Sequence, residues 1–139
     1  MATLSNLERV KTIKHKVLHD RVAPEQLLEW IDPHATINSP ANFEQETGAA
    51  ALLAVMDYWT QAFPNVTSHW QNTQETPAGQ VVVSWEAEAV HDGTAFFGVP
   101  AQNKPVTYSG TTTYHFNDQG KLIQYDVDID LDAIKAQLV

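Results

Sequence analysis

Cysteine is absent from this 139-residue sequence, and basic residues are few. Without cysteine the chain has no disulfide, no thiolate metal ligand and no thiol nucleophile. Eight Lys and Arg stand against 17 Asp and Glu, which gives a net charge of −9 and a pI near 4.9. Because nucleic acids and anionic membranes are bound through clustered basic residues, we expect neither a nucleic acid nor a membrane as partner.

Long apolar runs and known catalytic motifs are lacking as well. Residues 1–21 contain no apolar core of a secretory signal, and no stretch of about 18 apolar residues could span a bilayer. P-loop, GxGxxG, GxSxG and zinc signatures are absent. His15 and His19, four residues apart, are only a weak metal pair without further ligands. We therefore expect no metal site, and a cytoplasmic location is compatible with these features.

What the sequence does contain is typical of a globular protein. Apolar residues make up 43% of the chain, and no internal repeat or low-complexity linker interrupts it. The length favours a single domain spanning residues 1–139, which is long enough to bury one sizeable core.

The first part of the chain has helical periodicity. Apolar residues recur every three or four positions from Leu7 to Val17, and Thr3 or Ser5 could cap this helix. A second, short helix is predicted after Pro24, which is permitted in a first turn, and residues 32–34 are expected to end it.

A third helix is predicted between Thr47, a candidate N-cap, and Pro64, which stops it. Residues 35–43 between the second and third helices predict a small strand and a loop. The apolar stripe of the third helix has helical spacing and consists of Leu52, Val55, Met56, Trp59 and Phe63.

After Pro64 the apolar period changes from 3.6 to 2, which indicates strands. Helices followed by hairpin-linked strands predict an α+β fold, in which helices cover one face of a curved, mostly antiparallel sheet and enclose a pocket. The predicted strands are 66–75, 80–93, 106–116 and 121–130, followed by a closing helix at 131–139. Alternation in the strand at 80–93 places one set of side chains on the same face: Val81, Val83, Trp85, Ala87 and Ala89.

The last hairpin separates polar from apolar side chains. If residues 117–120 form a four-residue loop, Phe116 pairs with Lys121 and side chains alternate between the two faces. One face then holds Thr111, Thr113, His115, Leu122, Gln124, Asp126, Asp128 and Asp130. The other holds Thr112, Tyr114, Phe116, Ile123, Tyr125, Val127 and Ile129.

Three aspartates on one strand have two interpretations. Asp126 and Asp128 fit a solvated sheet face, which antiparallel sheets commonly present. Asp130 ends the strand and fits either an N-cap of the closing helix or a buried general acid/base. Mutual repulsion allows at most one of the three to lie deep, and Asp128 is the alternative if the register differs.

Histidine and tryptophan supply the other candidates. His91 fits a turn histidine that bonds to the backbone, and His115 fits either an exposed strand residue or a partner that orients a carboxylate. Aromatic walls are typical of small-molecule pockets. The four tryptophans are therefore candidates for core or pocket: Trp30, Trp59, Trp70 and Trp85.

Four sequence blocks resemble the SnoaL-like polyketide cyclase family, within the nuclear-transport-factor-2-like and ketosteroid-isomerase-like superfamily. They are "YWTQAFPNV", "VHDGTAFFGVPAQNKPV", "YHFNDQGKLIQYDVDID" and "LDAIKAQL". The resemblance runs from about Leu27 to the end of the chain. It departs at Gln124, Tyr125 and Asp126, where the family often has Glu-His-Trp, and at His115, where the family usually has Arg.

The resemblance implies a cone-shaped α+β barrel and a cofactor-free cyclase-, isomerase- or lyase-type reaction on a hydrophobic carbonyl compound. It implies Asp130 as general acid/base and His115 as its partner, with a homodimer as assembly. Tyr58, His115 or Asn38 would donate to the enolate oxygen. A non-catalytic ligand-binding or dimerisation module is the alternative. The expected pocket residues are Asp128, Trp30, Asn38, Tyr58, Trp59, Trp85, His91 and Phe97.

Overall fold

The structure is a computed structural model that describes residues 5–16, 22, 24–39 and 47–139. It has three α-helices, α1 (Asn6–Lys14), α2 (Gly48–Ala62) and α3 (Leu131–Leu138), and a 3-10 turn, η2 (Pro24–Leu27). The strands are β1 (Ile31–Asn38), β2 (Thr67–Glu75), β3 (Gln80–His91), β4 (Lys104–Phe116) and β5 (Leu122–Ile129).

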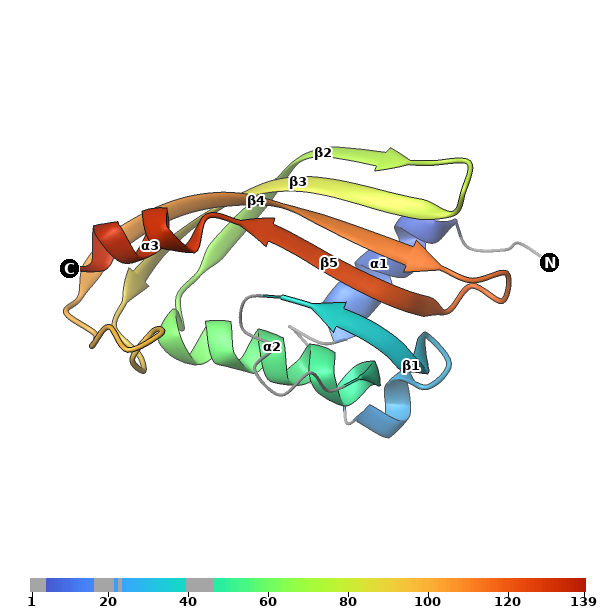
Figure 1. Ribbon diagram of the computed structural model, residues 1–139, viewed down its shortest axis with the longest axis horizontal. Helices are drawn as coiled ribbons and strands as arrows, with labels where there is room; N and C mark the ends of the chain where they lie inside the picture. The colour runs from blue at the N-terminus through green and yellow to red at the C-terminus, as the bar shows by residue number, and fades with distance from the viewer. Residues whose placement is uncertain (1–4, 17–21, 23, 40–46) are drawn as a thin grey trace.

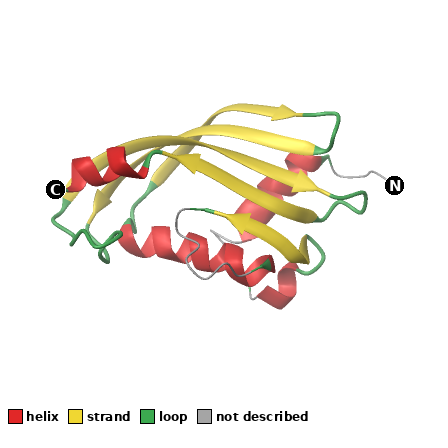
Figure 2. Ribbon diagram, viewed as in Figure 1, coloured by secondary structure: helices red, strands yellow, loops and turns green. Residues whose placement is uncertain are grey.

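Five strands form one curved sheet in the order β1-β5-β4-β3-β2 (Figure 1). β1 pairs parallel with β5, and the other neighbours are antiparallel hairpins. Figures 1 and 2 show α2 lying along one face of the sheet and α3 at the end where β5 finishes. The predicted α+β fold is therefore confirmed.

The N-cap residues predicted for the first and third helices are found at the starts of α1 and α2, but only one of them makes a capping hydrogen bond. The hydroxyl of Ser5 accepts a hydrogen bond from the N–H of Glu8 at 3.1 Å, so α1 begins with a capped first turn. Thr47 precedes α2 as expected, but its side chain makes no capping hydrogen bond. Thr3, the alternative cap of the first helix, and Val17, the last residue of its predicted apolar stripe, lie outside the described residues.

The prediction of a second helix is largely wrong. Only Pro24–Leu27 forms a 3-10 turn, and residues 32–34, expected to end a helix, lie inside β1. Pro33 is tolerated there because β1 is an edge strand, where one row of backbone donors needs no partner. The pairing of β1 with β5 is interrupted at this place, between Ile31 and Thr36.

The β4–β5 hairpin has a different register from the one predicted. His115 pairs with Gln124, two residues beyond the expected partner, and the register shifts again between His115 and Phe116, which pairs with Leu122. A register shift of two residues keeps each side chain on its predicted face of the sheet. The irregularity next to Phe116, however, makes the first two residues of β5 swap faces. Leu122 is fully buried, whereas Ile123 is 39% exposed.

The inner face of the sheet carries the core. On β3 the alternation places one set of side chains toward α2, as predicted: Val81, Val83, Trp85, Ala87 and Ala89. The larger core cluster joins α1, α2, β1 and the β3–β4–β5 strands. A smaller cluster joins the end of α2 to α3 through Phe63, Phe96 and Ile134. Between these clusters the inner face is not completely filled, and the pocket described below lies there.

None of the helices in the described ranges has both the length and the apolar composition needed to cross a bilayer.

Candidate ligand-binding pocket

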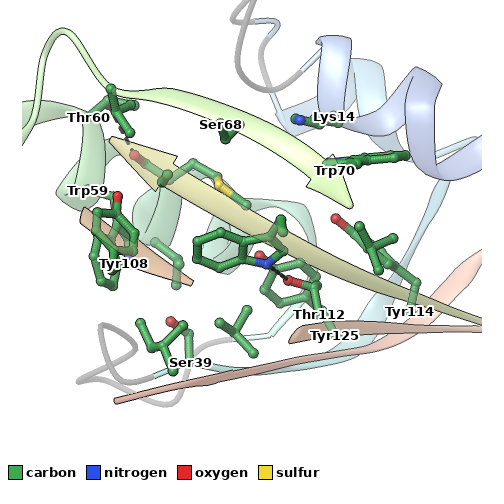
Figure 3. Close-up of a pocket in the computed structure, with 18 residues that line it drawn as sticks. Lys14, Ser39, Trp59, Thr60, Ser68, Trp70, Tyr108, Thr112, Tyr114 and Tyr125 are labelled. Atoms are coloured by element: carbon green, nitrogen blue, oxygen red, sulfur yellow. Dashed lines mark hydrogen bonds between the residues drawn. The ribbon is translucent and has the colours of Figure 1, made fainter. Parts of the chain in front are cut away.

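An apolar pocket of about 150 Å³ lies between α2 and the inner face of the sheet (Figure 3). Its aromatic wall consists of Trp59, Trp70, Trp85, Tyr108, Tyr114 and Tyr125. Aliphatic side chains fill the gaps between the rings: Val55, Met56, Val66, Val83, Ala87, Val127 and Ile129. The remaining lining residues are polar: Lys14, Ser39, Thr60, Ser68 and Thr112.

Trp85 projects from β3 across β4, and its position depends on a glycine. A Cβ at Gly110, which pairs with Trp85, would lie 2.6 Å from the indole and 2.4 Å from a methyl group of Ile129. The indole N–H of Trp85 also donates a 2.9 Å hydrogen bond to the hydroxyl of Thr112. Close approach at Gly110 and this hydrogen bond together fix the indole ring against β4.

The rings of the wall contact one another in edge and tilted geometries. Tyr108 lies between two tryptophans, 5.7 Å from the centroids of both Trp59 and Trp85. Tyr114 and Tyr125 pack edge to face at 5.3 Å. Such pairs stabilise aromatic clusters beyond the area they bury, so the wall is a packed surface with a preformed shape.

Burial makes the phenol groups of the wall harder to ionise. Desolvation raises the pKa of Tyr108 to about 12 and raises the pKa of Tyr114 further. The pKa of Tyr125 is raised well above its ordinary value by burial and by neighbouring Tyr114, and a hydrogen bond with Thr112 partly offsets these effects. At neutral pH the three phenols, like other tyrosines, have O–H groups that can donate to an oxygen acceptor.

No carboxylate and no imidazole lines this pocket among the described residues. Its charged side chain is Lys14, whose ammonium lies 4.7 Å from the centroid of the Trp70 ring. Burial lowers the pKa of Lys14. Within the described ranges, no three His, Asp or Glu side chains gather in a way that could hold a metal ion.

Two of the residues predicted to line a pocket, Trp59 and Trp85, lie in its wall, and the other six do not line it. Trp30 packs beside the larger core cluster. The hydroxyl of Tyr58 accepts a 2.7 Å hydrogen bond from the N–H of Phe97, near the smaller cluster. The side chain of Asp128 is exposed on β5.

His91 is fully buried rather than placed at the pocket. Its Nε2 bonds to the carbonyl oxygen of Thr94 at 2.7 Å, so Nε2 carries the hydrogen. The ring packs between Phe63 and Phe96. The interpretation as a turn histidine that bonds to the backbone agrees with this geometry.

His115 lies on the outer face of the sheet and contacts Asp126. Its Nδ1 is 2.9 Å from the side-chain nitrogen of Gln80, which can only donate, so Nε2 carries the hydrogen and donates to Asp126 at 3.1 Å. Asp126 also accepts bonds from Asn38 at 2.6 Å and Gln124 at 2.8 Å. This network joins β3, β4, β5 and β1 on the face opposite the pocket.

Asp130 caps α3. Its carboxylate accepts a 3.1 Å hydrogen bond from the N–H of Ala133, and the side chain is exposed. Gly110 pairs with Ile129, so Asp130 and His115 are separated by roughly 20 Å along the strands. The structure therefore does not bring the predicted catalytic pair together.

The sequence interpretation missed Lys14 and the three tyrosines of the wall. A signal for Lys14 was present, because it follows Leu7 and Val10 at i+7 and i+4 and so continues the apolar stripe of α1. The tyrosines were assigned only to an apolar or strand context. The strand faces that carry these tyrosines border an unfilled space because α2 lies at some distance from the sheet. The pattern of residues along a strand does not specify that distance.

A curved five-stranded sheet covered by helices, with an apolar pocket on its inner face, defines the class of nuclear-transport-factor-2-like folds. Solved structures of low sequence identity support this. A candidate SnoaL-like polyketide cyclase from Jannaschia sp. CCS1 aligns with a TM-score of 0.78 at 20% identity, covering 96% of this chain and 90% of that one.

Two further structures are similar. A candidate polyketide cyclase from Acidithiobacillus ferrooxidans gives a TM-score of 0.73 at 22% identity, covering 99% and 97% of the two chains. IdmH, a candidate polyketide cyclase from Streptomyces antibioticus, gives 0.73 at 22% identity, covering 97% and 99%. At this identity the likeness shows the fold alone. No curated protein matches the sequence.

The chain belongs to the SnoaL-like polyketide cyclase family, whose sequence pattern it matches over residues 9–138. The resemblance predicted from the four sequence blocks is therefore confirmed, and it extends further toward the N-terminus than those blocks.

Proposed function

We propose that this protein binds a hydrophobic, ring-containing carbonyl compound in the pocket between α2 and the sheet. The observation that carries the proposal is the aromatic wall of three tryptophans and three protonated tyrosines. The related structures described as candidate polyketide cyclases are consistent with a carbonyl-rich ligand of this kind.

The size and lining of the pocket favour a flat ring. A space near 150 Å³ accommodates about one benzene-sized ring. Flat aromatic surfaces are supplied by the adjoining rings of Trp59, Trp85 and Tyr108. A ring inserted there gains apolar contact and stacking, and larger parts of the ligand would extend toward the open side.

The phenols favour a carbonyl oxygen as the polar group of the ligand. Tyr108 stays protonated until about pH 12, so its O–H is a donor at any physiological pH. A phenol O–H stabilises a carbonyl or enolate oxygen by donating a hydrogen bond. In an apolar pocket such a bond is stronger than in water because the surroundings are less polar.

A pocket-filling variant tests the proposal. Ser68 lines the pocket from β2, an edge strand, whereas neighbouring Thr67 points to the other face and is exposed. Ser68→Phe should weaken binding of 2-naphthaldehyde, an aromatic carbonyl probe, at least tenfold in calorimetry, while Thr67→Phe leaves it unchanged. Equal binding by both variants, or no binding by the unmodified protein, would refute the proposed pocket function.

A second candidate function is catalysis by acid/base chemistry, with Asp130 as the acid/base group acting without His115, which lies at the other end of the hairpin. The supporting observation is that Asp130 directly follows Ile129, which lines the pocket. Asn caps helices as well as Asp does but cannot transfer a proton. Asp130→Asn should therefore abolish turnover without changing the melting temperature, whereas Asp132→Asn should retain turnover. Unchanged turnover in Asp130→Asn would exclude this role.

A further inference from the structure

Lys14 is held at the pocket by the way α1 docks on the sheet. The backbone N–H of Leu7 donates to the carboxylate of Glu75 at 2.6 Å, and the side-chain amide of Asn6 donates to the carbonyl oxygen of Gly79 at 3.2 Å. These contacts attach the first turn of α1 to the β2–β3 hairpin. Val10, which lies on the same face as Lys14 one turn earlier, is fully buried.

The last turn of α1 therefore points its lysine toward the aromatic wall. The ammonium lies over the ring of Trp70, 4.7 Å from the centroid, and both side chains line the pocket (Figure 3). A cation over a tryptophan face is attracted by the electrons of the ring. The contact fixes the position of the charge without neutralising it.

No carboxylate among the described residues forms an ion pair with Lys14. The pocket itself presents no Asp or Glu from the part of the chain that the structure describes. This arrangement is unusual in a chain with a net charge of −9 and only eight Lys and Arg. A charge that is partly removed from water normally has a partner of opposite sign.

We infer that the missing partner is the ligand, and that the pocket takes apolar ring compounds bearing an anionic oxygen, a carboxylate or an acid of similar shape. The ring would lie among the rings of Trp59, Trp85 and Tyr108, and the anionic oxygen would lie against Nζ of Lys14. This inference rests on the proposed pocket function and specifies the ligand class of the same site.

Charge recognition in a poorly solvated pocket discriminates strongly between an acid and its neutral analogue. A hydrogen bond to a charged group contributes more than a neutral one, and the apolar wall reduces screening by water. An amide of the same shape has no charge to pair with Lys14. The acid should therefore bind about tenfold more tightly than its amide.

The test compares 4-phenylbutyrate with 4-phenylbutanamide by calorimetry at neutral pH. The unmodified protein and Lys14→Arg should prefer the carboxylate about tenfold. Lys14→Met should lose this preference and bind the acid and the amide with about equal affinity. Lys11 is exposed on the same helix, so Lys11→Met is the matched control and should keep the preference.

The outcomes separate the two proposals. If the unmodified protein binds the acid and the amide equally, or if Lys14→Met retains the preference, the inference about Lys14 is overturned and the apolar pocket stands. If neither compound binds while 2-naphthaldehyde does, the inference is also overturned. If none of the three binds, the proposed pocket function itself fails.

Discussion

At the scale of single residues, Asp130 shows how a side chain with two plausible roles is assigned by local geometry. The carboxylate accepts the N–H of Ala133 and closes the first turn of α3. That turn presents Ile134 to the smaller core cluster, where it is almost fully buried. The cap thus supports the packing of α3 against β4 and α2.

Removing the cap should destabilise the protein measurably. Asp130→Ala leaves the N–H of Ala133 without its side-chain acceptor, and we expect a loss of about 1 kcal/mol in the free energy of unfolding. Urea denaturation followed by circular dichroism measures this. Asp128→Ala, at an exposed strand position, should change the stability much less. A loss of equal size in both variants would show that the cap contributes nothing specific.

The sequence identified residue types better than residue partners. The pattern placed His115 and the aspartates on one face, which agrees with the structure, but His115 contacts Asp126 rather than Asp130. The pair with Asp130 was implied by the family resemblance, whereas the hairpin sets Asp126 near His115 and leaves Asp130 at the other end of the strand. Lys14 was overlooked because a lysine within an apolar stripe is usually assigned to solvent.

At the scale of elements, β4 combines close packing with pocket formation. Gly110 in the middle of this strand leaves the space that the Trp85 indole and Ile129 occupy. The main chain oxygen of Asp128 lies 3.0 Å from the place where a Cβ would stand, so only the two side chains could move aside.

Gly110→Ala should therefore disturb the pocket wall. Because the added methyl group overlaps Trp85 and Ile129, we expect a destabilisation of about 1–3 kcal/mol and weaker binding of aromatic probes. Thermal denaturation and the emission maximum of tryptophan fluorescence would report both effects. Ser109→Ala, at the adjacent exposed position, is the control. If the variant has the stability and the fluorescence emission of the unmodified protein, the side chains of Trp85 and Ile129 move aside without cost, and the expectation is wrong.

Helices and strands were predictable from the sequence where the apolar residues follow one period without interruption. The α2 stripe and the β3 alternation were correct, because each follows a single period over many residues. β1 was missed at its start because a Pro at position 33 normally argues against a strand. Whether a proline lies on a sheet edge depends on the strand order, and the local sequence does not contain that information.

At the scale of the whole molecule, the three tyrosines of the pocket wall connect the pocket to stability at alkaline pH. Tyr108, Tyr114 and Tyr125 have raised pKa values in the folded protein, whereas an unfolded tyrosine ionises near pH 10. Their contribution to stability is complete below about pH 10. It falls as the pH rises further, because the unfolded state then loses protons first.

We therefore expect alkaline unfolding between about pH 10 and 12, with Tyr108 alone accounting for up to about 3 kcal/mol over that interval. Tyrosinate absorbance at 295 nm and circular dichroism should change together as these phenols ionise. Tyr108→Phe should move the unfolding midpoint to higher pH. Ionisation of the three phenols near pH 10 in a protein that stays folded would contradict the expectation.

Assembly is a separate prediction at this scale. We expect a homodimer, as the family resemblance implies. Sedimentation velocity at several protein concentrations would measure the mass, and a single species of about 15.5 kDa would exclude the dimer.

The half-buried Lys14 has a consequence for protein engineering. Burial lowers the pKa of Lys14, so the folded chain is less favourable for the ammonium than water is. A redesign that maximises thermostability would select methionine or leucine at this position and would score the change as an improvement. The redesigned protein would melt at a higher temperature and, if Lys14 recognises an anionic ligand as proposed, would no longer distinguish an acid from a neutral ring compound.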